Sequence, residues 1–143
     1  MEKNAQPPFL DPQKVKIILA EDNPVNQKVA QMMLNRCGFS VAAANNGIEV
    51  IKLLKKASWD LILMDIQMPE LDGIRTTKII RNPESDIPRK DIPIIAMTAQ
   101  ATPGDEQLCL DAGMDAYLSK PITCKGLVAI INKVLGVTHR TNS

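Results

Sequence analysis

Short hydrophobic segments alternate along this chain with segments of helical periodicity, and this alternation most constrains the fold. The segments near residues 15–20, 60–64 and 93–97 are almost continuously apolar and rich in β-branched residues. That composition is typical of strands buried on both faces of a parallel sheet. Two shorter segments, 40–44 and 115–118, complete a set of five predicted strands.

Five helices are predicted, one after each strand, and the first four would return the chain to the start of the next strand. Their ranges are 25–37, 48–56, 73–81, 104–112 and 127–135. In the first of them, Val25, Val29, Met32 and Met33 have the spacing of one helical face and are expected to be buried. Strands that alternate with helices imply a parallel sheet with right-handed crossovers and helices on both faces. The sequence therefore predicts a doubly wound α/β domain.

The domain is expected to occupy residues 14–136 of the 143-residue chain. Residues 1–13 are rich in proline and are interpreted as an N-terminal tail or linker, and residues 137–143 as a C-terminal tail. A polar, proline-containing loop at 82–92 precedes the fourth strand.

The composition argues against several classes of protein. Lys and Arg number 17 and Asp and Glu 16, so the net charge of +1 does not suggest nucleic-acid binding. No apolar run approaches the ~20 residues of a membrane span, and the N-terminus does not resemble a secretory signal. The three cysteines, Cys37, Cys109 and Cys124, are widely spaced and are expected to be unpaired. These features favour a cytoplasmic protein.

Polar residues follow four of the predicted strands, at the edge where ligands bind in doubly wound sheets. Glu21 and Asp22 follow the first strand, Asp65 the third, Thr98 the fourth and Lys120 the fifth. Because the carboxyl ends of parallel strands lie along one edge of the sheet, we expect these side chains to converge.

Such a cluster has a definite chemistry. Two carboxylates 4 Å apart repel by ~4 kcal/mol at an effective dielectric of 20, so three of them must share protons or bind a cation. Oxygen ligands without nearby Cys or His favour Mg²⁺, and a lysine with a threonine hydroxyl suits phosphoryl oxygens. The cluster therefore predicts a Mg²⁺-dependent phosphoryl site in which one carboxylate forms an aspartyl phosphate.

At these positions the sequence resembles the receiver domains of two-component response regulators. The resemblance covers about residues 14–136 and rests on four segments together: ILAEDNPVNQ, LILMDIQMPELDG, IIAMTA and YLSKP. It implies a flavodoxin-like sheet of five strands in the order 2-1-3-4-5.

The resemblance also implies roles for individual residues. Asp65 would accept phosphate from a phosphohistidine. Glu21, Asp22, Asp65 and the backbone carbonyl of Gln67 would hold Mg²⁺, and Lys120 would contact a phosphoryl oxygen.

The remaining implied roles concern switching and loop shape. Thr98 would bond the phosphoryl group and move towards it, and Tyr117 stands where the family has a rotating aromatic residue. Pro69, Gly73 and Pro121 would shape the loops, and the peptide bond before Pro121 is expected to be cis.

The segments EDNPVNQ and AMTA are similar to those of receivers in hybrid sensor histidine kinases. The implied partners are a histidine kinase or a histidine phosphotransfer domain, with neither nucleic acid nor direct membrane contact. Any dimerisation is expected to depend on phosphorylation. The domain itself would transfer phosphate only to and from its own aspartate. Its parent chain would be the kinase, in the cytoplasm or on the cytoplasmic side of a membrane; a free single-domain regulator is the alternative.

Two other classes of protein share parts of this pattern. A Mg²⁺ phosphatase of the haloacid dehalogenase type would need an acid two residues after the nucleophile, where this chain has Gln67. A flavodoxin would need a Ser/Thr/Gly-rich phosphate loop after the first strand, where this chain has an acidic one. A P-loop nucleotide site is excluded because the chain contains no GxxxxGK motif.

Overall fold

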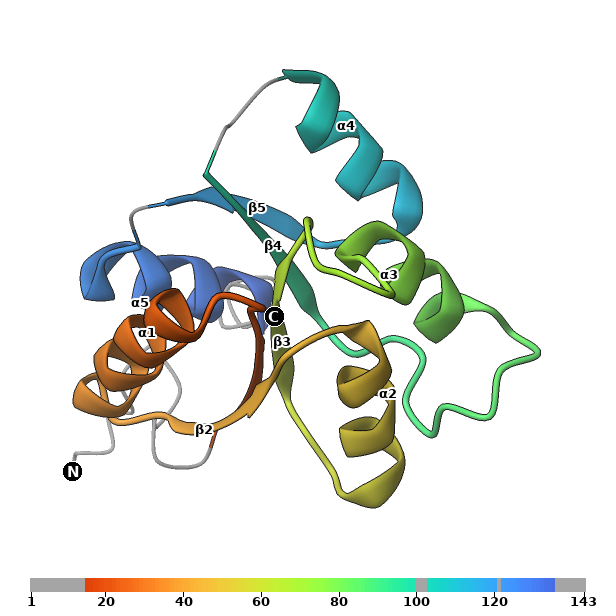
Figure 1. The fold of residues 1–143 in the computed structure, drawn as a ribbon, viewed down its shortest axis with the longest axis horizontal. Coiled ribbons are helices and arrows are strands. Elements are labelled where there is room, and N and C mark those ends of the chain that lie inside the picture. The colour runs from red at the N-terminus through yellow and green to blue at the C-terminus, as the bar shows by residue number, and fades with distance from the viewer. Residues whose placement is uncertain (1–14, 100–102, 121, 136–143) are drawn as a thin grey trace, which may run out of the picture.

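The computed structural model describes residues 15–99, 103–120 and 122–135, in which a five-stranded parallel sheet lies between two layers of helices (Figure 1). The strand order is β2-β1-β3-β4-β5, which confirms the predicted fold. In chain order the elements are β1 (Lys16–Ala20), α1 (Pro24–Arg36), β2 (Ser40–Ala44), α2 (Gly47–Lys56), β3 (Leu61–Asp65), α3 (Gly73–Arg81), β4 (Ile94–Thr98), α4 (Pro103–Ala112), β5 (Ala116–Ser119) and α5 (Cys124–Val134).

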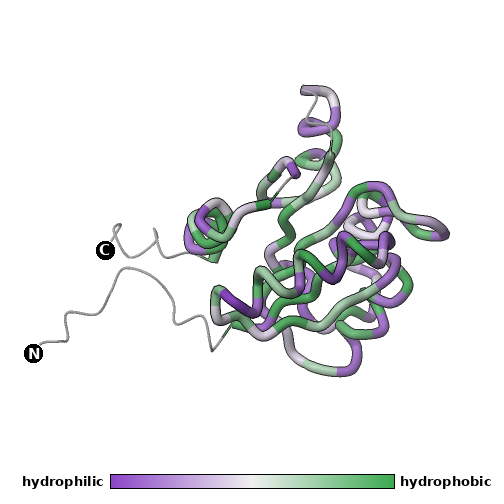
Figure 2. The backbone as a smooth tube through the Cα atoms, turned by 60° about the vertical axis from the view of Figure 1, so that its left-hand side comes forward, coloured by the Kyte–Doolittle hydropathy of each residue, from purple (hydrophilic) through white to green (hydrophobic). Residues whose placement is uncertain are grey.

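The sheet separates two hydrophobic cores. Helices α1 and α5 cover one face, and α2, α3 and α4 cover the other (Figure 1). Along β3, Leu61 and Leu63 belong to the first core, whereas Ile62 and Met64 belong to the second. Successive strand residues point to opposite faces, so a strand with a core on each side must be apolar throughout. Figure 2 shows the contrast with the helices, along which hydrophobic and hydrophilic residues alternate.

Capping side chains determine where four of the helices begin. Each accepts a hydrogen bond from the backbone N–H three residues later, and the four are Asn23, Asn46, Asp72 and Thr123. Helices α2 and α5 begin earlier than predicted, at Gly47 and Cys124, because hydrophobic periodicity does not mark their first residues. None of the described helices is long and apolar enough to cross a membrane.

Helix α1 presents a different face to the sheet from the one predicted. Its buried residues are Ala30 and Leu34, with Met33 packed partly against them. Val25, Val29 and Met32 are 70%, 55% and 54% exposed, so the prediction that they are buried is wrong. Two stripes of this helix have apolar spacing, and the one with Ala30, Met33 and Leu34 packs against the sheet. The other stripe remains at the surface.

The cysteines also differ from expectation. Cys37, at the C-terminus of α1, and Cys124, at the start of α5, form a disulfide with their Cα atoms 6.3 Å apart. The prediction of unpaired cysteines is therefore wrong for this pair, whose members lie 87 residues apart in the sequence. Cys109 is free and fully buried, as expected.

Arg81, in the last turn of α3, fixes the long connection between α3 and β4. Its guanidinium donates hydrogen bonds to the carbonyls of Gly113 and Lys90, at 3.0 and 2.6 Å, and to the carboxylate of Asp115 at 3.0 Å. The same Asp115 oxygen accepts the backbone N–H of Ile94 at 2.8 Å. A single side chain thus ties α3, the 82–92 loop and the starts of β4 and β5 together.

Candidate functional site

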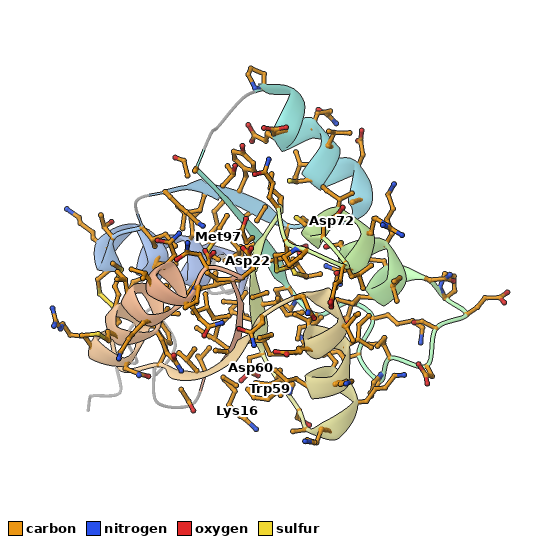
Figure 3. All side chains as sticks on the ribbon, viewed as in Figure 1. Lys16, Asp22, Trp59, Asp60, Asp72 and Met97 are labelled. Carbon is orange, nitrogen blue, oxygen red and sulfur yellow. A yellow bond between two sulfur atoms is a disulfide. The ribbon has the colours of Figure 1, made fainter. Side chains whose placement is uncertain are left out.

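A polar pocket of about 670 Å³ lies at the carboxyl edge of the sheet, where the sequence predicted convergence. Its lining includes the five predicted residues Glu21, Asp22, Asp65, Thr98 and Lys120. Figure 3 shows Asp22 and Met97 near this edge, and Lys16, Trp59 and Asp60 grouped at the other end of the sheet. The strand ends therefore place the predicted residues in one site.

Three carboxylates lie together in this pocket. One ligand oxygen from each of Glu21, Asp22 and Asp65 lies within 4.8 Å of the others. Glu21 and Asp65 are buried, at 2% and 7% exposed, whereas Asp22 is exposed. Asp65 is the last residue of β3, one position beyond the predicted end of that strand, and so it is held by the sheet itself.

Lys120 forms ion pairs with both buried acids. Its Nζ atom lies 2.5 Å from Oε1 of Glu21 and 3.3 Å from Oδ2 of Asp65. The other oxygen of Glu21 accepts the backbone N–H of Asn23 at 3.1 Å. The Lys120 backbone N–H donates to the Thr98 carbonyl at 2.7 Å, which anchors the lysine to the end of β4.

Burial controls the protonation of Asp65. It raises the pKa of the carboxyl to about 6, against the opposing influence of the Gln67 backbone N–H, which donates to Oδ1 at 3.0 Å, and of Lys120. The charge of Glu21 adds to the increase. Burial acts against the charge of Lys120, but the hydrogen bond to Glu21 and the charges of both acids outweigh it, so the pKa of Lys120 is raised. Asp65 is therefore ionised at neutral pH and protonated in mild acid.

The donor set of the pocket fits a hard divalent cation. Carboxylate oxygens from two strand ends converge, and the described part of the chain brings no histidine or cysteine to them. Mg²⁺ is bound in proteins through one or two carboxylates together with water and substrate phosphate. The open pocket leaves room for both of these additional ligands.

Gly73, the first residue of α3, packs directly under Asp65. A Cβ atom at this position would lie 2.5 Å from the Asp65 carbonyl oxygen and 2.9 Å from both Cα of Ile66 and Cγ of Met64. The Gly73 N–H also donates to the Ile66 carbonyl at 3.2 Å. Only a residue without a side chain allows α3 to begin so close to the strand that carries the carboxylate.

We expect Gly73→Ala to lower the free energy of unfolding by ~2–3 kcal/mol, because the added methyl group meets backbone atoms that cannot move aside. Gly104→Ala is the matched control, since a Cβ on Gly104 meets nothing within 4 Å. That variant should be stabilised by ~0.5–1 kcal/mol through lower backbone entropy in the unfolded chain. Urea denaturation measures both values, and equal stabilities would contradict the packing argument.

A family model described as the response regulator receiver domain matches residues 17–132. The chain belongs to the response regulator receiver domain family. It is thus a receiver domain of phosphorelay signalling, as the sequence motifs predicted, and not a phosphatase of the haloacid dehalogenase type or a flavodoxin.

Several known proteins are similar to this chain in sequence or in structure. Hybrid signal transduction histidine kinase M of Dictyostelium discoideum is 42% identical over 121 residues, covering 83% of this chain and 5% of the relative. The receiver domain of a Pseudomonas aeruginosa PAO1 sensor histidine kinase, solved with a magnesium ion in its active site cleft, is 40% identical with a TM-score of 0.76, covering 85% of this chain and 98% of that one. A chain from the co-crystal of the Saccharomyces cerevisiae phosphotransfer protein Ypd1 with the Ssk1 receiver domain is 31% identical with a TM-score of 0.71, covering 87% and 89%.

The chain spans a small part of the length of its curated relatives, between 5% and 17% for the first three. Those relatives are histidine kinases, so this receiver domain resembles one module of much longer proteins.

The other predicted site residues lie around the pocket or away from it. Gln67 and Pro69 line the pocket. Tyr117 lies on β5 outside the pocket lining, partly buried against the core beneath α2, α3 and α4. Pro121, with its expected cis peptide bond, falls outside the described residues.

Six residues of the lining had no predicted role in this site, and Asn26 and Asp72 are two of them. Asn26 lies on the first turns of α1, and Asp72 caps α3. Both residues lie at the N-terminus of a helix that begins close to a strand end. Their distance along the sequence from Asn23 and from Gly73 could therefore have placed them beside the site. Neither has a residue type that distinguishes it from an ordinary surface or capping residue.

Proposed function

We propose that this receiver domain accepts a phosphoryl group on Asp65 from a phosphohistidine. The observation that carries the proposal is the geometry of this carboxylate. Its two oxygens are oriented by the Gln67 N–H and by Lys120, and it lies in a pocket that is open to an incoming group. A buried carboxylate that is fixed on one side and open on the other is suited to in-line attack on phosphorus.

The transfer is balanced within the two partners. An oxygen of Asp65 attacks phosphorus, an O–P bond forms and the P–N bond to the imidazole breaks. The bonding pair returns to the imidazole nitrogen, which takes up a proton from solvent. Lys120, already within reach of Asp65, would contact a phosphoryl oxygen, and Thr98 at the end of the adjacent strand would bond another.

Glu21, Asp22, Asp65 and the backbone carbonyl of Gln67 are proposed to hold Mg²⁺. The acidic cluster supports this ligand set, and so does the magnesium ion in the similar receiver domain from Pseudomonas aeruginosa. When bound, the cation offsets the negative charge that accumulates as phosphate approaches three carboxylates.

Thr98 and Tyr117 are proposed as the switch. Thr98 pairs with Ser119 across β4 and β5, and Tyr117 pairs with Ala96 two positions earlier in the same ladder. A displacement of Thr98 towards a phosphoryl group on Asp65 would therefore be transmitted along two paired strands to Tyr117. Phosphorylation would shift an existing equilibrium of that face.

The exposed stripe of α1 is proposed as the docking surface for the phosphodonor. The stripe consists of Val25, Val29 and Met32, all of which are exposed. Val29 also lines an apolar groove of about 420 Å³, which shares Glu21 and Lys120 with the phosphoryl pocket. A donor helix that covers these apolar residues would bring its phosphohistidine to the pocket. The complex of a similar receiver with a histidine phosphotransfer protein in yeast supports this class of partner.

The similar proteins support a proposal about the parent protein in which this domain acts. We propose that the domain, residues 14–136 with tails at 1–13 and 137–143, serves a hybrid histidine kinase on the cytoplasmic side. In this setting it catalyses only its own phosphorylation and dephosphorylation, without contact with nucleic acid. A free single-domain regulator is the alternative, and any dimerisation is expected to depend on phosphorylation.

The test is phosphoryl transfer in the presence and absence of metal. Incubated with Mg²⁺ and either acetyl phosphate or a phosphorylated histidine phosphotransfer protein, the wild-type chain should gain one phosphoryl group by intact-mass spectrometry. Chelation with EDTA should suppress the gain from both donors. A chain that remains unmodified with every donor in excess Mg²⁺ would contradict the proposal.

The same assay separates docking from chemistry. Met32→Glu places a charge on the apolar stripe, outside the lining of the phosphoryl pocket. We expect transfer from the phosphotransfer protein to slow by about tenfold or more, as for loss of an interface anchor. Transfer from acetyl phosphate, which needs no docking surface, should be unchanged. Equal slowing with both donors would place the defect in the pocket.

A further inference from the structure

The amide of Gln27, in the second turn of α1, is directed back at the acidic loop. Its Nε2 atom donates to the backbone carbonyl of Glu21 at 2.9 Å and to Oδ1 of Asn45 at 3.0 Å, and lies 3.4 Å from the carbonyl of Ala44. The Glu21 N–H also donates to the Ala44 carbonyl at 3.0 Å. Both backbone polar groups of Glu21 are therefore held, one by β2 and the other by Gln27.

The loop between β2 and α2 continues these contacts to Glu70, in the loop after β3. Asn45 donates to Glu49 through its backbone N–H at 2.8 Å and its side chain at 3.1 Å. Asn46 accepts the Glu49 N–H at 3.0 Å and donates from its side chain to Glu70 at 3.1 Å. Glu70 has a φ of 65°, a left-handed conformation that is unusual for a residue with a side chain.

The hydrogen bonds thus form one polar chain between the two loops that carry the acids. The first is the loop after β1 with Glu21 and Asp22, and the second is the loop after β3, which continues from Asp65 to Glu70. The connecting loop after β2 is absent from the lining of the phosphoryl pocket. Its side chains contact Gln27 and Glu70 instead, through Asn45 and Asn46 respectively.

We propose that Gln27 is a positioning residue for Mg²⁺ binding, which fixes the backbone of the Glu21–Asp22 turn with its amide oriented by Asn45. This inference rests on the proposed function, because it assigns the turn to the metal. Asp22 is exposed, so its carboxylate is held mainly by the backbone that precedes it. Without the Gln27 amide, the Glu21 carbonyl can rotate and the Asp22 carboxylate samples orientations that do not meet those of Glu21 and Asp65.

Metal affinity is the quantity that this role predicts. Gln27→Met keeps the length of the side chain and removes both donors. We expect the Kd for Mg²⁺, measured by isothermal titration calorimetry, to rise about tenfold, the lower end of the loss seen when a residue that orients a metal ligand is removed. Phosphorylation by acetyl phosphate should be slow at low Mg²⁺ and return to the wild-type rate at saturating Mg²⁺. If Gln27 had a merely structural role, Gln27→Met would lower the melting temperature, and the rate of phosphorylation would not depend on Mg²⁺ concentration in this way.

Gln31→Met is the matched control, since it makes the same change one turn further along α1, outside both pockets. It should bind Mg²⁺ as the wild type does. Asn45→Ala should weaken binding in the same direction and add little to Gln27→Met, because the two residues act through one hydrogen bond. It also provides a second variant should Gln27→Met fold poorly.

Each outcome bears on the inference. Weaker Mg²⁺ binding by Gln27→Met with an unchanged Gln31→Met supports it. Wild-type affinity in both Gln27→Met and Asn45→Ala overturns it and leaves the proposed function standing. A wild-type chain that shows no Mg²⁺ binding overturns both this inference and the proposed metal site.

Discussion

Asp65→Asn is expected to accept no phosphoryl group from any donor. The amide has the shape of the carboxylate but neither its charge nor its nucleophilic oxygen, so the O–P bond cannot form. Intact-mass spectrometry after incubation with acetyl phosphate and Mg²⁺ provides the measurement. Asp60→Asn is the control: Asp60 directly precedes β3, where its side chain accepts the Lys16 N–H at the opposite end of the sheet. The Asp60→Asn variant should be phosphorylated to the same extent as the wild type.

The pH dependence of stability shows whether Asp65→Asn remains folded. Burial raises the pKa of Asp65 to about 6, so the folded chain holds this proton at pH values where the unfolded chain has released it. Stability associated with this group therefore falls as the pH rises from about 4 to about 6, and the deficit is complete above pH 6.

The variant lacks this deficit and should be more stable than the metal-free wild type by ~1–2 kcal/mol at pH 7, with no difference near pH 4. The value is below the full conversion of the pKa shift because the pocket is open to water. Urea denaturation in EDTA at both pH values measures the difference. Incorporation of phosphate by a folded Asp65→Asn would remove Asp65 as the acceptor.

Lys120→Met is expected to slow phosphorylation by about 100- to 1,000-fold, the loss typical when a preorganised group that stabilises transition-state charge is removed. Two buried acids lose their cation, since Nζ pairs with both Glu21 and Asp65. The pKa of Asp65 should rise further, because the charge and hydrogen bond of Lys120 lower it. The reaction should consequently need a higher pH as well as run more slowly.

The affinity of Lys120→Met for Mg²⁺ should not fall along with the rate of phosphorylation. Lys120 occupies carboxylate oxygens that a cation would use, so its removal should leave Mg²⁺ binding at least as tight as in the wild type. Lys125→Met is the matched control, an exposed lysine on the first turn of α5. Phosphorylation of Lys120→Met at the wild-type rate would show that the lysine does not act on the phosphoryl group.

The site could be predicted from the sequence because residues that follow the strands of a parallel sheet lie together at one edge of that sheet. Glu21, Asp22, Asp65, Thr98 and Lys120 all follow predicted strands, and one topology brings every strand end to the same edge. Errors of a residue in strand boundaries did not disturb that convergence. The family motifs then supplied chemical roles that spacing alone leaves open.

Features that are set by tertiary packing could not be predicted from the sequence. In α1, two apolar stripes have helical spacing, and only the packed sheet selects the one with Ala30 and Leu34. The Cys37–Cys124 pair requires α1 and α5 to share a face, which no local pattern indicates. Gln27 is a polar residue on a helix surface, and its importance emerges from the atoms that it reaches.

The division of the interior into two cores has a consequence for how this domain can change. The stripe of α1 proposed to meet the donor lies on one side of the sheet, and Tyr117 packs into the core on the other. Substitutions that retune which protein delivers the phosphate need not alter the side chains around Tyr117. With the proposed donor surface and the proposed switch residue on separate cores, input specificity and output specificity would diverge separately, while the acidic pocket at the shared edge remains the same.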